Sequence, residues 1–377
     1  MNTVIRTKNP VDLLAYAPYR LGFRPRESVV LLGMRPPRSA VGLVMRLDLA
    51  HVGDETHGGS ALAESAELMG VDGSTDALVV IYTDLPRHQL GAASTPGRAV
   101  ARLREETTWC EAPGPWVVGA EAYGVWGSGP SCEPLVSPLS DLEYGSMAAT
   151  LVLEGLTVVA GRDGLRVAPA ADPVHRDAAG RAYRKGRRQR LMLQGRVAGD
   201  PGHDAAAVIE AVAELAAWRR SQHHLWRRMV ARTSEGKGVS AGELGRLLAG
   251  LEDVQLRDAA MCVALAPGPA WLPTMREIDH AFAGAMGPGG SPPDAQRVDP
   301  VAAVLRHAAA SVGGVAAAPA LGMLGWLAWW SGDSARADVL SDQCLAVAPD
   351  HRLARLVQQA VANHLPPGWV VDDAASA

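Results

Sequence analysis

Charged and hydroxyl side chains flank the apolar segments in the first quarter of the chain, where they could bind a ligand. Arg24 lies just before the run ESVVLLGM (Glu27–Met34), and Arg46 and Asp48 lie two residues apart in the next apolar segment. An arginine can hold a carboxylate or a bound anion by charge-assisted hydrogen bonds, and ligands of α/β proteins bind beyond the carboxyl ends of strands. We therefore predict a small-ligand or catalytic site composed of Arg24, Arg46, Asp48, Thr83 and Asp84.

The same residues also fit a purely structural role, and the sequence leaves both interpretations open. The turn Arg24–Glu27 could be solvated, because charges at strand ends are ordinary. The pair Arg46 and Asp48 could be an edge-strand ion pair that discourages aggregation. Asp84 could accept hydrogen bonds from the backbone N–H groups of a turn.

A dense run of positive charge lies at His175–Arg190 and contains one aromatic residue, Tyr183. Such a cluster can neutralise several phosphate groups of a nucleic acid. The alternative is a solvated helix that joins two domains. The residues that would contact nucleic acid are Arg181, Arg184, Arg187, Arg188 and Arg190.

Sequence motifs of well-known catalytic and metal sites are not found. The segment EGKGVS lacks the glycine spacing of a phosphate-binding loop, and neither GxSxG nor HExxH occurs. His223 and His224 are adjacent, so on a helix they point about 100° apart and are poorly placed to bind one metal ion. We predict no metal site and can name no cofactor. No CxxC pair contains any of the four cysteines, Cys110, Cys132, Cys262 and Cys344.

Length and charge limit the classes of protein that the chain could represent. With 377 residues it is long enough for two domains. A formal net charge of −4 excludes a globally basic nucleic-acid binder but allows a local basic patch. The cysteine usage suits a reducing compartment, and the first residues lack the apolar region of a secretory signal. We therefore expect a cytoplasmic protein.

Strand and helix patterns alternate over residues 1–170, which predicts an α/β sandwich domain with a mixed sheet. The run Glu27–Met34 is continuously apolar, as expected for a strand buried on both faces. The next segment, Ala40–Leu49, reads as its hairpin partner. Period-two alternation places Arg46 and Asp48 on one face of that strand. The opposite, buried face should carry Leu43, Met45, Leu47 and Leu49.

Helical periodicity replaces the strand pattern after about residue 170. We predict a basic helical connector at 171–200, a helical domain at 201–367 and a tail at 368–377. The segment Ala308–Gly332 carries no charged residue and is long enough to span a bilayer. It is rich in glycine and alanine, and Pro319 interrupts it, so a buried helical hairpin is favoured over a membrane span.

The last helices show the spacing of small residues that is typical of a tetratricopeptide repeat. We expect Ala320–Trp330 and Ser334–Ala348 to form an antiparallel pair, with Gly325 and Ala337 at the closest approach. A single repeat cannot bury its own apolar face, so it must pack on other helices or on a partner. Surplus aromatic residues there suggest a partner-binding surface, because tryptophan is enriched among binding hot spots. The candidates are Trp326, Trp329 and Trp330.

Taken together, these segments resemble the actinobacterial domain of unknown function 4192 family. The resemblance rests on LGFRPRESVVLLGM, MRLDL, ALVVIYTD, LEDVQLRDAA and the tryptophan-rich C-terminal stretch, and it covers about Asn9 to Pro367. Family members usually carry a Cys-Cys-Pro-like segment, where this chain has only SCEP (Ser131–Pro134). The resemblance implies an actinobacterial cytoplasmic protein and supplies no activity. Our first functional hypothesis is a protein-interaction adaptor, and the alternatives are a small-ligand binder or enzyme, and a nucleic-acid-associated protein.

Overall fold

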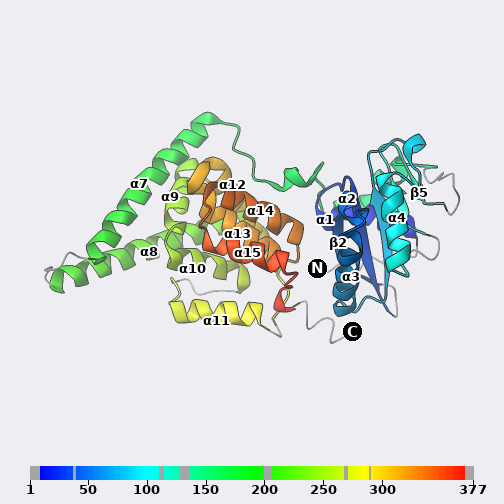
Figure 1. The fold of residues 1–377 in the computed structure, drawn as a ribbon. Helices are drawn as coiled ribbons and strands as arrows, with labels where there is room; N and C mark the ends of the chain where they lie inside the picture. Colours follow the sequence, from blue (N-terminus) through cyan, green and yellow to red (C-terminus); the bar gives the residue numbers. More distant parts are fainter. Residues whose placement is uncertain are drawn as a thin grey trace. The chain divides into compact units, whose positions relative to one another are not determined.

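In a computed structural model, the chain forms two compact units, Met1–Leu165 and Arg166–Ala377. The first unit contains a mixed β-sheet with helices, and the described part of the second unit is helical (Figure 1). This confirms the fold class predicted from the alternation of strand and helix patterns. The structure describes residues 9–36, 40–109, 114–127, 136–198, 205–266, 271–287 and 290–369.

The α/β unit is built around a mixed sheet of six strands in the described residues. They are β1 (Ser28–Arg35), β2 (Ala40–Asp48), β3 (Asp76–Tyr82), β4 (Trp116–Val118), β5 (Ala122–Val125) and β6 (Ser137–Pro138). Their order in the sheet is β2-β1-β3-β4-β5-β6. Strand β1 is antiparallel to both neighbours, which confirms the predicted hairpin with β2, whereas β3 and β4 are parallel. The parallel pair is joined through helix α4 (Thr95–Glu106).

One face of this sheet is covered by the helices that connect its strands. Val29 and Leu31 of β1 and Ile81 of β3 are fully buried there. They share a core with apolar residues of α2 (Leu49–Val52), α3 (Gly58–Val71) and α4. These connections form because a βαβ crossover packs the apolar stripe of its helix against the sheet.

The opposite face is buried as well. Val30 and Leu32 of β1 alternate with the residues of the first face and are fully buried. Three helices of this unit, α1 (Pro10–Leu21), α5 (Ser140–Glu143) and α6 (Ser146–Leu153), pack on one another, and α1 also contacts β2. A strand buried on both faces must be continuously apolar, which explains the run of four apolar residues, Val29–Leu32, in β1.

Strand β2 lies at the edge of the sheet, and this changes part of the predicted burial. Leu43, Met45 and Leu47 face the first core, as expected, but are only half-buried. Leu49 is fully buried but belongs to α2 and not to the strand. An edge strand has a neighbour on one side only, so its side chains are covered less completely than those of β1.

The second unit contains nine α-helices in its described residues. They are α7 (Pro173–Ala198), α8 (Ala205–Ser234), α9 (Ala241–Leu251), α10 (Val254–Leu265), α11 (Met275–Met286), α12 (Ala295–Ser311), α13 (Ala318–Trp330), α14 (Ser334–Val347) and α15 (Arg352–Ala362). Helix α9 begins with a capping box, in which the side chains of Ser240 and Glu243 each bind the other's backbone N–H, as a serine three residues before a glutamate favours. A large shared core joins residues from α8 to α15.

The basic segment predicted as a connector is a helix of this second unit. Helix α7 packs closely along α9. A Cβ at Gly245 would overlap the backbone of Ala179, and a Cβ at Gly186 would lie 2.9 Å from the Cβ of Ala249. Small residues on both helices therefore allow the close approach, and the described residues of the segment, 171–198, belong to the helical unit.

The uncharged segment Ala308–Gly332 is divided between two buried helices. Helix α12 ends at Ser311, a short 3-10 turn, η3 (Gly314–Ala317), follows, and α13 begins at Ala318. Almost every residue of α13 is buried inside the helical unit. In the part of the chain that the structure describes, no helix has the length and apolar character needed to cross a bilayer.

Helices α13 and α14 pack as a pair, with small residues at the contact. Only three residues separate the two helices, and a Cβ at Gly325 would lie 2.9 Å from the Oγ of Ser341 and 3.4 Å from the carbonyl oxygen of Ala337. Gly332 turns the chain with a φ of 76°, a conformation that favours glycine. Gly325 and Ala337 therefore lie at a close approach of the two helices, as expected.

Candidate functional site

Charged and hydroxyl groups gather at one end of the sheet in the α/β unit. Strand β1 begins there with Ser28, which pairs with Asp48 at the end of β2 and with Tyr82 at the end of β3. Strand β4, which is parallel to β3, also ends at this edge, where Val118 pairs with Tyr82. The carboxyl ends of β2, β3 and β4 thus meet at the same edge, the usual place for a ligand in an α/β protein.

Arg46 lies at the centre of this cluster. Its Nε donates a hydrogen bond of 2.7 Å to the Oγ of Ser28, and its Nη2 lies 3.4 Å from Asp48 Oδ2. Ser28 is fully buried and donates from Oγ to the carbonyl oxygen of Arg26 at 2.6 Å. The predicted neighbourhood of Arg46 and Asp48 is therefore present, and Ser28 anchors the guanidinium to the first strand.

Glu27 is a member of the cluster that the predicted set did not include. Its Oε1 accepts hydrogen bonds from Thr83 Oγ1 at 3.0 Å and from the backbone N–H of Asp84 at 2.6 Å. The backbone of Glu27 is left-handed, with a φ of 42°. Such a conformation is strained for any residue with a Cβ, and strained residues of this kind gather at functional sites.

Arginines from the turn before β1 form exposed ion pairs on this edge. Arg26 donates to Asp84 Oδ2 from Nε at 3.0 Å and from Nη2 at 2.7 Å. Arg24 bonds instead to Glu143 of α5. Of the five predicted residues, Arg46, Asp48, Thr83 and Asp84 are linked through Ser28, Glu27 and Arg26, whereas the ion pair of Arg24 lies outside that network.

Burial and a like charge act on the Arg46 guanidinium. Burial is the largest influence and lowers the pKa of Arg46, Asp48 raises it, and the nearby Arg162 lowers it again. The Arg46 side chain is 28% exposed. The positive charge is therefore partly desolvated, its bond to Asp48 is long, and it lies close enough to a second guanidinium to be repelled by it.

Two further observations bear on what this edge does. Asp48 caps α2 by accepting hydrogen bonds from the backbone N–H groups of Ala50 and His51, at 3.0 and 3.4 Å, so part of its role is structural. Tyr82 lies on the same face of the sheet as Ser28, and its buried hydroxyl has no hydrogen-bond partner in the described residues. Burial raises the pKa of Tyr82, and an unpaired buried hydroxyl is costly.

The arginines of α7 divide between two sides of that helix. Arg190 is buried and bound to Glu252, and Arg187 lies 3.4 Å from the same carboxylate. The other cations of the cluster are exposed and are spaced so that they share one helical face. They form no ion pair in the described part of the chain and are Arg181, Arg184, Lys185 and Arg188.

The three candidate tryptophans of α13 lie mostly in the core. Trp326 and Trp330 are 4% and 2% exposed, and their rings stack with centroids 5.6 Å apart. Trp329 is half-buried and donates from Nε1 to the carbonyl oxygen of Leu365 at 2.9 Å. One of the three therefore packs on a different element, as expected, and only Trp329 is accessible to a partner in this fold.

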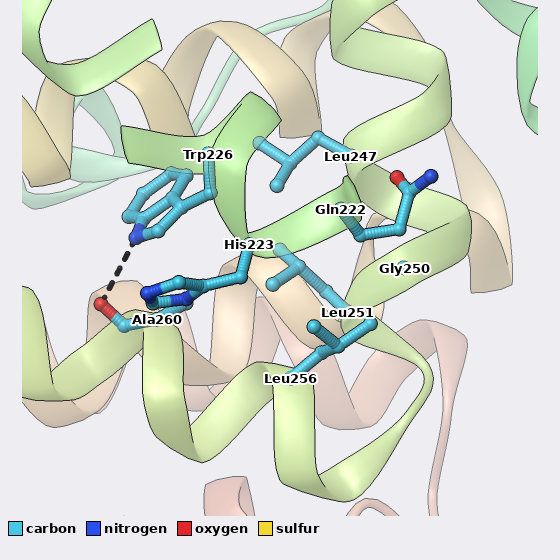
Figure 2. A pocket seen from close by; sticks show the side chains of 8 residues that line it. All are labelled: Gln222, His223, Trp226, Leu247, Gly250, Leu251, Leu256 and Ala260. Carbon is cyan, nitrogen blue, oxygen red and sulfur yellow. Dashed lines mark hydrogen bonds between the residues drawn. The ribbon is translucent and has the colours of Figure 1, made fainter. Parts of the chain in front are cut away.

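A small cavity in the helical unit contains an unusual histidine (Figure 2). His223 is 3% exposed, and neither ring nitrogen has a hydrogen bond of normal geometry in the described residues. Burial is the main cause that lowers the pKa of His223 to about 4, and Arg227 and His224 lower it further. With a volume of about 10 Å³, the cavity is at the lower limit for holding a single water molecule.

Comparison with known proteins identifies a family without an assigned activity. The family model described as Domain of unknown function (DUF4192) matches residues 10–368. Searches of curated proteins and of solved structures each find no match to the chain. The function must therefore be argued from the site itself.

Proposed function

We propose that this chain, which belongs to the DUF4192 family, binds a small anionic ligand through Arg46. The site is the sheet edge, by which we mean the edge where the carboxyl ends of β2, β3 and β4 meet. The proposal rests on one observation above all. A partly desolvated guanidinium is anchored to a buried serine, lies close to the like charge of Arg162, and stands where three strands end. A bound anion would compensate the positive charge of Arg46, which the 3.4 Å contact with Asp48 offsets only in part.

The chemistry of the edge suits an anion. A guanidinium has five N–H donors, and Arg46 uses two of its three nitrogens, Nε for Ser28 and Nη2 for Asp48. The Tyr82 hydroxyl, which has no partner in the described residues, lies on the same sheet face and is a further donor. A carboxylate or phosphate group can accept two bonds from one arginine.

Replacing Arg46 by Gln should abolish this binding. We expect pyrophosphate to bind the wild-type protein in isothermal titration calorimetry and to raise its melting temperature. A ligand at a hundred times its Kd stabilises by about 2.7 kcal/mol, which corresponds to roughly 5–10 °C for a domain of this size. The Arg104→Gln variant, which removes an exposed arginine of α4, is the matched control. Equal binding by the Arg46 and Arg104 variants, or none by the wild type, would contradict the proposal.

Nucleic-acid binding is a second candidate, favoured by the exposed cationic face of α7. Four cations on one face without ion pairs in the described residues could contact successive phosphates. If they do, the affinity for nucleic acid should fall steeply as the salt concentration rises. Replacing Arg184, Arg187 and Arg188 by Ala should make the slope of log K against the logarithm of the salt concentration less steep by about 2. Fluorescence anisotropy with labelled RNA and DNA measures both. Absence of binding at low salt would leave α7 as a solvated helix.

The adaptor hypothesis and the location stay proposals. Trp329 is the tryptophan of α13 best placed to contact a partner protein, and a tetratricopeptide-like nature of α13–α15 is supported by the sequence spacing and by their close packing. An actinobacterial, cytoplasmic origin is supported by the resemblance and by free, buried cysteines at Cys262 and Cys344.

A further inference from the structure

The helical unit contains a second, larger cavity, which shares Leu251 with the lining of the His223 cavity. Its volume is about 390 Å³, which is within the usual range for small-molecule sites. Five of the residues that line it are apolar or small, namely Leu251, Val315, Ala318, Pro319 and Ala348. The other five are polar, namely Tyr183, Arg187, Glu252, Arg257 and His351.

The one carboxylate in the lining is already neutralised. Glu252 accepts a hydrogen bond from the hydroxyl of Tyr183 and one from the buried guanidinium of Arg190. Arg187 Nε also lies 3.4 Å from Glu252 Oε2. Burial is the largest cause that raises the pKa of Tyr183 to about 12, and the bond to Glu252 adds to it. This carboxylate therefore has little capacity left to attract a cationic ligand.

The two arginines of the lining keep most of their donors. Arg257 donates from Nε to Asp258 Oδ1 at 2.8 Å, and Arg187 has only its ion pair with Glu252. The terminal nitrogens of both have no partner in the part of the chain that the structure describes. Since each guanidinium carries five N–H groups, two partly used arginines face one cavity.

His351 adds a neutral donor to this lining. Its Nδ1 accepts a hydrogen bond from the backbone N–H of Ala354 at 3.3 Å. A neutral imidazole that accepts at Nδ1 carries its proton on Nε2. Burial, followed by the charge of Arg257, lowers the pKa of His351, so the ring is neutral near pH 7 and its Nε2–H can donate.

The side chains, not the helix dipoles, set the sign of the charge here. Three helices, α10, α13 and α15, begin at this cavity, and two others, α9 and α14, end at it, so most of their opposed partial charges cancel. Among the side chains, the guanidiniums of Arg187, Arg190 and Arg257 outnumber the carboxylates of Glu252 and Asp258. The cavity is therefore net positive.

We propose that this cavity binds a small organic anion whose phosphate or carboxylate group contacts Arg187 and Arg257 and whose apolar part packs on Leu251, Val315 and Pro319. The His351 Nε2–H supplies a third donor. This proposal does not rest on the function proposed for the sheet edge, because all of its residues belong to the helical unit.

Isothermal titration calorimetry with phenyl phosphate and benzoate tests the proposal, and inorganic phosphate measures the contribution of the apolar part. We expect saturable binding of phenyl phosphate or benzoate at concentrations up to about 10 mM. Replacing Arg187 by Gln should weaken it by about tenfold or more, because a charge-assisted hydrogen bond is lost. Whichever of the two probes binds more tightly identifies the anionic group.

Two control variants make the outcome specific. Arg188→Gln removes a neighbouring exposed charge that does not line the cavity, and Arg46→Gln removes the sheet-edge arginine. Arg188→Gln should leave the affinity for phenyl phosphate unchanged. In Arg46→Gln, which lacks the proposed sheet-edge site, the binding that remains should be that of the cavity, with its affinity unchanged. Equal weakening by the Arg187 and Arg188 variants, loss of binding in the Arg46 variant alone, or no saturable binding of either organic anion would overturn the proposal.

Discussion

Replacing Trp330 by Ala is expected to destabilise the helical unit by about 3–5 kcal/mol, the usual cost of truncating a fully buried aromatic side chain. Trp330 is 2% exposed and stacks on Trp326 at 5.6 Å. Its Nε1 donates to the carbonyl oxygen of Ala285 at 3.4 Å, and its own carbonyl oxygen accepts from Trp369 Nε1 at 2.8 Å. The loss of stability is measured by urea denaturation, with the circular dichroism signal at 222 nm as the readout, because most helices belong to this unit.

Trp329→Ala is the matched control for this experiment, because it removes the same kind of side chain one position away. Trp329 is half-buried and makes one hydrogen bond, to Leu365, so its removal should cost about 1–2 kcal/mol. Similar losses in the two variants would show that the stacking and burial of Trp330 do not stabilise the unit as argued.

The same pair of variants bears on the adaptor hypothesis. A partner that docks on α13 can reach Trp329 but cannot reach Trp326 or Trp330 while the unit is folded. The Trp329 variant should therefore keep its fold and bind a partner less tightly. If it keeps both its fold and its partners, the adaptor hypothesis loses its local support on this helix.

Acid is expected to destabilise the helical unit through His223. The pKa of this ring is about 4 in the folded chain and about 6.5 when exposed. Between these values the unfolded state binds more protons than the folded state, so stability is full above pH 6.5 and falls as the pH decreases to 4. A difference of about 2.5 pKa units corresponds to about 3 kcal/mol lost across this window. The midpoint of urea unfolding, measured at intervals from pH 7 to pH 4, should decrease in parallel with this loss of stability.

A neighbouring histidine provides the control for the pH experiment. His224 is exposed, whereas His223 is buried beside Trp226 (Figure 2). The His223→Leu variant should lose most of the difference in stability between pH 7 and pH 4, and His224→Leu should keep it. An unchanged pH dependence in the His223 variant would mean that carboxylates, not this ring, govern the acid sensitivity.

Several elements could be predicted because local patterns decide them. A continuously apolar segment forms β1, a two-residue period forms β2, and a serine three residues before a glutamate caps α9. The pairing of α13 with α14 follows from small residues at the contact and a glycine turn. Each of these patterns is read within one or two neighbouring elements.

The candidate site was predicted only in part. The positions of Arg46, Asp48, Thr83 and Asp84 at strand ends could be read from the sequence, and they do share one edge. Glu27 could not be assigned, because its left-handed backbone and its bonds to Thr83 and Asp84 depend on how β1 lies beside β3. The only sequence signal for Glu27 was its position, as a charged residue between Pro25 and the apolar strand β1.

By itself, the sequence determined the order and type of the elements, because hydrophobic periodicity, caps and turns act over a few residues. Tertiary structure alone decided which charges meet. Arg187 reaches Glu252 from another helix, and Arg24 turns to Glu143 more than a hundred residues away. It also decided that Arg190 is buried although its neighbours along α7 are exposed, and that Trp326 and Trp330 are buried whereas Trp329 is only half-buried. Contacts between distant segments depend on packing, which favours the arrangement that buries the most apolar surface and leaves the fewest polar groups unpaired.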